Sequence, residues 1–266
     1  MKRVGLTLAF LALGGAPALA ADRLTDKDVK ALVSRIEQGR DRFDDALDDK
    51  LKGSIVRQPS GEVNVENFLN DFQESIDRLE ERLKPGYAAS AEVGTVLRQA
   101  TAIDRFFRAQ APGTRGESEW NRLATDLKTL AAAYGTQFPI TDNAAVRRIG
   151  DKELEASIEE VARVSNQLKK ALDNDLKREP TVDKAARQAA VNEADQLLKD
   201  AKTLRERVKD GNPSSAEAER LLAQAAKVQN FLSGRQLPTS AAAWSGAQSG
   251  LQSLASAYGA AWPANR

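Results

Sequence analysis

Residues 65–83 read VENFLNDFQESIDRLEERL, and residues 190–208 read AVNEADQLLKDAKTLRERV. In both stretches the apolar residues recur in steps of three and four, which places them on one face of an α-helix. These positions are Val65, Leu69, Phe72, Ile76, Leu79 and Leu83 in the first stretch, and Ala190, Ala194, Leu197, Ala201, Leu204 and Val208 in the second. The patterns coincide at an offset of 125 residues, which predicts two copies of one helix.

The same offset aligns most of one half of the chain with the other half. It pairs Asp26–Lys27 with Asp151–Lys152, Ala46–Asp48 with Ala171–Asp173, Glu81–Arg82 with Glu206–Arg207, Gly86 with Gly211, and Phe106 with Phe231. After a single deletion, an offset of 124 pairs Trp120 with Trp244, Tyr134 with Tyr258, and Pro139 with Pro263. The sequence therefore predicts an internal duplication.

Each half contains four apolar patterns at helical spacing, separated by short segments rich in Pro and Gly. Short loops between long helices favour antiparallel neighbours. We therefore predict an all-α fold, a tandem duplication of an antiparallel up-down-up-down four-helix bundle, with the first bundle over 21–140 and the second over 141–266. No stretch has the period-two pattern of a strand, so no strands are expected. Residues 144–149 lack a helix breaker and are expected to be helical.

Helix starts carry their own signals. Thr25 stands three residues before Asp28, which is the spacing of a capping box. Ser90, Ser118 and Ser215 are further N-cap candidates.

Residues 1–20 have the pattern of a signal peptide. Lys2 and Arg3 precede an apolar run from Val4 to Ala16, and Ala18–Ala20 supply small residues before the expected cleavage between Ala20 and Ala21. A membrane anchor is the alternative, but the run is short and interrupted by Gly. We predict export to the periplasm or the medium, with no transmembrane segment after cleavage.

Charge argues against one class of partner. Removal of Lys2 and Arg3 leaves 37 Lys and Arg against 38 Asp and Glu. Nucleic-acid-binding proteins normally carry a basic surplus, so no nucleic-acid partner is expected.

The chain contains no His and no Cys. This excludes catalysis by a His base, nucleophiles activated by His, haem attachment through Cys, and the usual zinc ligand sets. We therefore predict no enzyme activity, no catalytic or metal site and no cofactor, although an enzyme that uses only carboxylates is an open alternative.

Five carboxylates lie close together in the first helical pattern: Asp41, Asp44, Asp45, Asp48 and Asp49. Such a group could collect Ca²⁺, but a straight helix fans its side chains outward and does not wrap them round an ion. The duplicate also has Lys169 and Lys170 in place of Asp44 and Asp45. We favour a solvated acidic face.

Aromatic residues are the other candidate site, as core or as the lining of a ligand pocket. They are Trp120, Tyr134, Phe138, Trp244, Tyr258 and Trp262. Trp120 and Tyr134 are two heptads apart on one apolar stripe, as are Trp244 and Tyr258, so we favour the core.

Arg98, Arg105 and Arg108 recur at helical spacing, whereas the duplicate has Ala223, Asn230 and Ser233. These arginines are either an ordinary charged surface or a docking face for an acidic partner. Copies that keep their cores and differ outside commonly present different surfaces to partners. We predict a non-catalytic interaction or scaffold module of the cell envelope, whose partner is another envelope protein or polymer. The alternative is a carrier of a small apolar ligand, held between helices or between the bundles.

Overall fold

The computed structural model describes residues 23–58, 61–110, 115–179, 182–260 and 262. The predicted signal peptide and its cleavage site lie outside these residues. Within them, ten helices account for most of the chain and the strands form one short hairpin. The prediction of an all-α protein is confirmed at the level of fold class.

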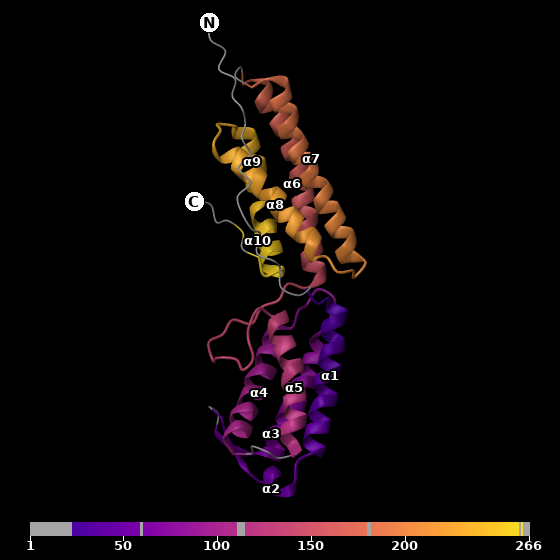
Figure 1. The fold of residues 1–266 in the computed structure, drawn as a ribbon, viewed down its shortest axis with the longest axis vertical. Coiled ribbons are helices and arrows are strands. Elements are labelled where there is room, and N and C mark those ends of the chain that lie inside the picture. Colours follow the sequence, from indigo (N-terminus) through magenta and orange to yellow (C-terminus); the bar gives the residue numbers. More distant parts are fainter. Residues whose placement is uncertain (1–22, 59–60, 111–114, 180–181, 261, 263–266) are drawn as a thin grey trace.

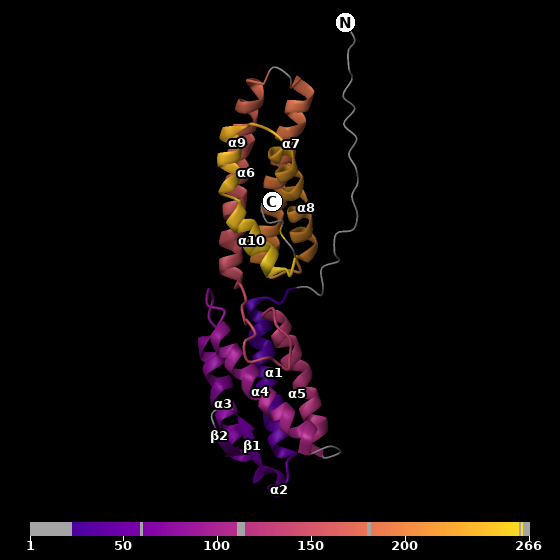
Figure 2. The same ribbon diagram turned by 90° about the vertical axis from the view of Figure 1, so that its left-hand side faces the viewer.

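Four long helices lie side by side in the N-terminal part (Figures 1 and 2): α1 (Asp26–Asp45), α3 (Val65–Arg82), α4 (Ser90–Gln110) and α5 (Arg115–Ala133). α1 packs against α3 and α5, and α4 packs against the same two helices. Their apolar stripes meet in one buried cluster that extends along the chain from Val29 to Ile140. We call residues 23–140 unit 1.

The C-terminal part has its own core. Its helices are α6 (Asp151–Lys177), α7 (Lys184–Lys209), α8 (Ser215–Ser233), α9 (Pro238–Ser245) and α10 (Gln248–Ala257). α6 packs against α7, α9 and α10, and α8 packs against α7 and α10. A second buried cluster extends from Ile149 to Tyr258. We call residues 148–262 unit 2, and Figures 1 and 2 show it stacked end to end with unit 1.

The segment between α1 and α3 contains strands, so the expectation of none is wrong here. A one-turn helix, α2 (Asp49–Lys52), precedes the antiparallel pair β1 (Ile55–Gln58) and β2 (Gly61–Asn64). Val56 lies opposite Val63 and is buried in the core of unit 1. Two strands of four residues are too short for a period-two pattern to stand out. In unit 2 the longer helices α6 and α7 occupy the corresponding part of the chain.

The expected helix over residues 144–149 is also wrong. The amide of Arg147 donates to the carbonyl of Tyr134, and the amide of Arg148 donates to Ser90 Oγ. These contacts hold the segment in a non-helical conformation against unit 1, so tertiary bonds override the local helical preference.

Helix ends agree with the sequence in part. Thr25 and Asp28 form the predicted capping box of α1. Ser90 and Ser215 are the first residues of their helices and Ser118 lies inside α5, so these three N-cap predictions are wrong. The last predicted helix is interrupted after Ser245, where the amides of Gly246 and Ala247 donate to carbonyls three residues back. Such i→i−3 bonds tighten a helix end.

Candidate functional site at the junction of the two units

The first helices of the two units meet at their N-termini. Each of these ends carries unpaired amides and the positive end of a helix dipole. Asp26 is the first residue of α1 and Asp151 is the first residue of α6. The amide of Asp26 donates to Asp151 Oδ2 at 2.7 Å, and the amide of Asp151 donates to Asp26 Oδ2 at 3.1 Å. Each carboxylate therefore caps the helix of the other unit.

Two arginines complete this junction. The guanidinium of Arg23 donates to the Asp151 carboxylate and to the carbonyl of Ile149. The guanidinium of Arg148 donates to the Asp26 carboxylate and to the carbonyl of Leu24. The side chains of Arg23 and Arg148 are only 10% and 3% exposed. Two cations and two anions thus neutralise one another in a largely buried place, where charge-assisted bonds have strict geometry.

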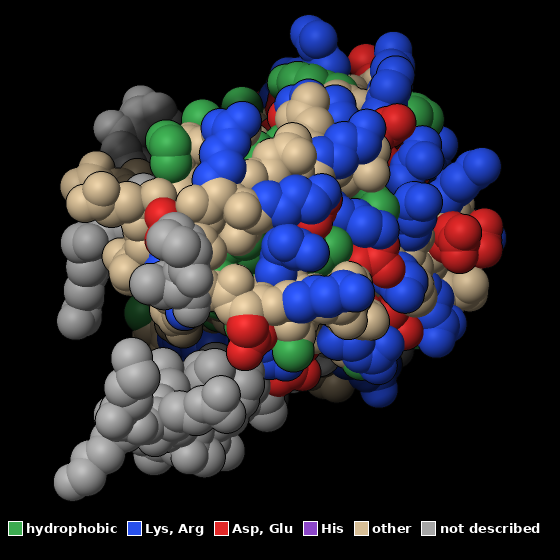
Figure 3. Space-filling model, turned by 90° about the horizontal axis from the view of Figure 1, so that it is seen from above, with side chains coloured by type: hydrophobic (Ala, Val, Ile, Leu, Met, Phe, Trp, Pro, Cys, Tyr) green, Lys and Arg blue, Asp and Glu red, His purple; other side chains and the backbone are tan. Residues whose placement is uncertain are grey.

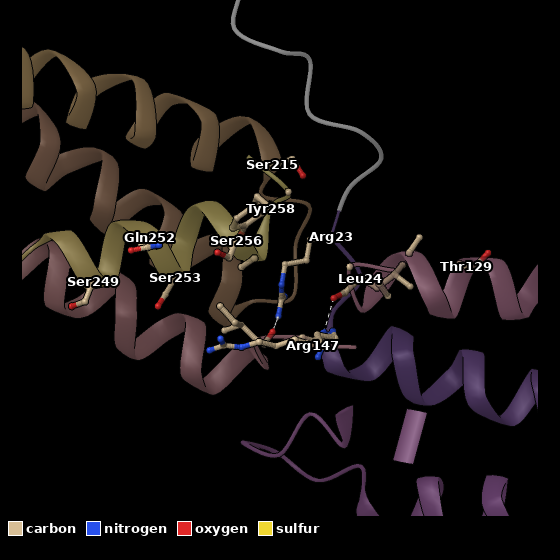
Figure 4. A pocket seen from close by; sticks show the side chains of 17 residues that line it. Arg23, Leu24, Thr129, Arg147, Ser215, Ser249, Gln252, Ser253, Ser256 and Tyr258 are labelled. Atoms are coloured by element: carbon tan, nitrogen blue, oxygen red, sulfur yellow. Dashed lines mark hydrogen bonds between the residues drawn. The ribbon is translucent and has the colours of Figure 1, made fainter. Parts of the chain in front are cut away.

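A cleft of about 670 Å³ lies beside this network (Figure 4). One wall comes from α5 and the opposite wall from α10, and the junction segments form the floor between them. The lining includes Thr129, Ala132 and Ala133 on one side, and Ser249, Gln252, Ser253, Ser256 and Tyr258 on the other.

Arg147 gives this cleft a positive charge. It is exposed, and its guanidinium makes no hydrogen bond or ion pair within the described part of the chain. The described lining residues include hydroxyls, an amide and guanidinium groups, but no carboxylate or imidazole. Such groups can bind a polar or anionic ligand, but they do not pair a nucleophile with a general base.

Five of the six candidate aromatic residues lie in the two cores. Trp120, Tyr134 and Phe138 are buried in unit 1, and Trp244 and Tyr258 are buried in unit 2. Trp262 is half-buried against the second core, and its indole donates to Gln248 Oε1 at 3.2 Å. Among the six, only Tyr258 also lines the cleft.

The buried indoles and phenols have polar partners. Trp120 Nε1 donates to Asp104 Oδ1 at 2.9 Å, and Trp244 Nε1 donates to Gln229 Oε1. Tyr134 donates to the carbonyl of Ala88, and Tyr258 shares a hydrogen bond with Ser214. Burial raises the pKa of Tyr134 to about 12 and also raises the pKa of Tyr258.

Three of the five clustered carboxylates have separate local partners. Asp44 pairs with Arg40 and Lys52, Asp41 pairs with Arg40, and Asp48 caps α2. Among the residues that the structure describes, no group of three or more potential ligands is placed to hold a metal ion.

The arginines of α4 lie on its outer face. Arg98, Arg105 and Arg108 are all exposed. Arg108 pairs with the buried carboxylate of Asp104 at 2.6 Å, so the positive charge of Arg108 is partly neutralised within unit 1. For Arg98 and Arg105, the described residues provide no ion-pair partner.

The contact between the two helix N-termini at the junction was not predicted from the sequence. The duplicated Asp–Lys pair extends three residues back to Arg23 and Arg148, which obey the same offset of 125. That extension was the available signal. Nothing in it indicated that the two copies of the motif would contact each other.

No family model, curated protein or solved structure matches the chain. Within the described residues, none of the helices combines the length and the apolar character that a membrane crossing requires.

Proposed function

We propose that the chain is a tandem duplication of an antiparallel four-helix bundle. The helix starts support this, because α1 and α6 begin at Asp26 and Asp151, and α4 and α8 begin at Ser90 and Ser215, each pair 125 residues apart. The partners of the two equivalent tryptophans, Asp104 and Gln229, are separated by the same offset. The order of helix neighbours is also the same in both units.

We infer that the protein is a non-catalytic scaffold or interaction module that is exported to the cell envelope. The observation that carries this proposal is the reciprocal Arg–Asp junction. It links two separately packed cores end to end, so that the outer faces of both units are held at a defined spacing. A catalytic site would not need this arrangement, whereas a partner that contacts both units would depend on it.

The outer faces supply different chemistry to partners. The row Arg98, Arg105 and Arg108 in unit 1 is replaced by Ala223, Asn230 and Ser233 in unit 2. Lys and Arg side chains are also prominent on unit 2 when the molecule is viewed from its end (Figure 3). Unit 2 also contains paired charges, as in Lys169–Asp195 and Lys177–Asp173. The unpaired guanidinium groups of α4 favour an acidic partner for unit 1.

The alternative function is that of a carrier, with a small apolar ligand held between helices or between the two units. The junction cleft has a volume that is typical of ligand sites, which run from about 300 to 1,000 Å³. Its guanidinium, hydroxyl and amide groups suit a polar ligand better than an apolar one. Mass spectrometry of gently purified protein tests this alternative, and a co-purifying lipid or pigment would support it over the scaffold.

Photo-cross-linking in intact cell envelopes tests the scaffold proposal. A photoreactive residue replaces Arg105 in one variant and the equivalent Asn230 in another, and both positions are exposed. We expect a discrete adduct with an acidic envelope protein or polymer from position 105, weakened by salt, and a weaker or different adduct from position 230. The absence of any adduct from either unit across growth conditions would contradict the proposal.

N-terminal sequencing of the mature protein tests export. The first residue found should be Ala21 if the chain is exported as proposed.

A further inference from the structure

The contacts that the two aspartates and the two buried arginines make across the junction form reciprocal pairs. Arg23 reaches Asp151 and the carbonyl of Ile149, and Arg148 reaches Asp26 and the carbonyl of Leu24. Arg23 and Arg148 are equivalent in the duplication, as are Leu24 and Ile149, and Asp26 and Asp151. A bond from unit 1 to unit 2 is therefore accompanied by the equivalent bond from unit 2 to unit 1.

This reciprocity is the signature of a two-fold symmetric interface, in which the same patch serves on both sides. We propose that the junction is a self-complementary docking surface, complete on each unit, and that its partner is a second copy of either unit. The proposal rests on the duplication proposed above. It goes beyond that function because it assigns the surface through which units recognise one another.

The chemistry of the junction supports pairing of like with like. Two helix N-termini face each other, and their positive dipole ends would repel without anions between them. The carboxylate on each side supplies that anion, and the arginine on each side then balances the carboxylate opposite. Each unit contributes one cation and one anion, so two copies of the same unit would also give a neutral junction.

The residues that differ between the two units do not prevent two copies of the same unit from pairing. Gly150 stands where unit 1 has Thr25. A Cβ atom added at Gly150 would lie 3.4 Å from Asp26 Oδ2, which is an ordinary van der Waals contact. Leu24 and Ile149 contribute their backbone carbonyls, which do not depend on the side chain.

The test uses the full chain, cut only after it has folded. A protease recognition sequence is inserted after Asp142, in the exposed segment 141–143 between the two cores, and the folded protein is cleaved there. Native mass spectrometry and size-exclusion chromatography then follow the two fragments. We expect three dimers after exchange: unit 1 with unit 2, unit 1 with itself and unit 2 with itself. Fragments that run only as monomers, or only as the mixed pair, would overturn the proposal.

Two arginine variants sharpen this result. Arg23→Ala removes both arginines from the unit 1 homodimer, one from the mixed dimer and none from the unit 2 homodimer. We therefore expect loss of the first, weakening of the second by about a hundredfold, as for a broken buried charge pair, and no change in the third. Arg148→Ala should give the converse pattern. If both variants weakened all three dimers equally, the symmetric assignment would be wrong.

Arg163→Ala is the matched control, because Arg163 is an exposed residue of α6 that pairs with Glu160 within its own unit. It should leave all three dimers unchanged, and the circular-dichroism spectra of all variants should match that of the parent. A failure of this test would not affect the cross-linking experiment on the outer faces. Conversely, the lack of an envelope partner would leave the dimer pattern intact.

Discussion

The two units bury equivalent positions but fill them with different side chains. In unit 1, Phe43, Phe107 and Trp120 form an aromatic cluster with ring centroids 4.9–6.4 Å apart. In unit 2 the positions equivalent to the two phenylalanines hold Leu168 and Leu232, which belong to the same buried core as Trp244. Cores tolerate such exchanges when their volume and pattern are kept. The comparison teaches that the helical arrangement depends on where apolar groups stand more than on which apolar groups they are.

A second difference shows compensation across a helix contact. In unit 1, Gly39 of α1 faces Leu123 of α5, and a Cβ atom added at Gly39 would lie 3.1 Å from Leu123 Cδ1. The equivalent residues in unit 2 are Val164 and Ala247. In unit 1 the small residue lies in the first helix, α1, whereas in unit 2 the small residue, Ala247, lies between α9 and α10 and the large residue, Val164, lies in α6.

The largest expected effect comes from the equivalent tryptophans. Trp120→Ala should destabilise unit 1 by about 3–5 kcal/mol, because it leaves a cavity beside Phe43 and Phe107 and removes one of the two partners of buried Asp104. Trp244→Ala should cost less, since Gln229, the partner of Trp244, is uncharged. Differential scanning calorimetry of both variants measures this. If either variant melted at the same temperature as the parent protein, the assignment of that tryptophan to the core would be wrong.

The second-largest effect is a loss of stability at alkaline pH. The raised pKa of Tyr134 means that the folded state holds the phenol proton more tightly than the unfolded state does. This contribution is fully present below pH 10 and is lost as the pH rises towards 12, by roughly 2–3 kcal/mol. Urea denaturation at pH 8 and at pH 11.5 should show the loss for the parent protein and a smaller loss for Tyr134→Phe. An equal loss in both proteins would contradict the prediction.

The third effect comes from placing the residue pair of unit 2 at the equivalent positions of unit 1. Gly39→Val should destabilise unit 1 by about 1–3 kcal/mol through overpacking against Leu123. The double variant with Leu123→Ala reproduces the pair found in unit 2 and should recover part of that loss in urea denaturation. Additive costs would show that the two positions are not coupled.

The smallest effect concerns the helix caps. Thr25→Ala removes the side-chain cap of α1 and should cost unit 1 about 1 kcal/mol. Unit 2 has Gly150 at this position, which makes no side-chain cap bond, so Gly150→Ala should change the thermal midpoint of unit 2 less. A larger change for Gly150→Ala would indicate that this glycine is required at the junction.

The helices could be predicted from the sequence because their apolar stripes are local and recur at a fixed period. Phe72 and Leu197, for example, lie on predicted stripes and are both buried. The hairpin at Val56 and Val63 could not, because four-residue strands carry too little pattern. The course of residues 144–149 depends on partners far away in the chain, Ser90 and Asp26 among them. The junction could not be predicted for the same reason, since Arg23 and Asp151 are 128 residues apart in the chain.

The reciprocal pairing of Arg23 and Asp151 with Arg148 and Asp26 saturates once two units have met. No matching end is then left from which further units could add, so contacts of this kind give closed pairs and cannot propagate into fibres. A concatemer engineered with an odd number of units would leave one end with an uncompensated helix terminus, and an even number would not. This dependence on an odd or even number of units follows from the two-fold symmetry of the junction alone.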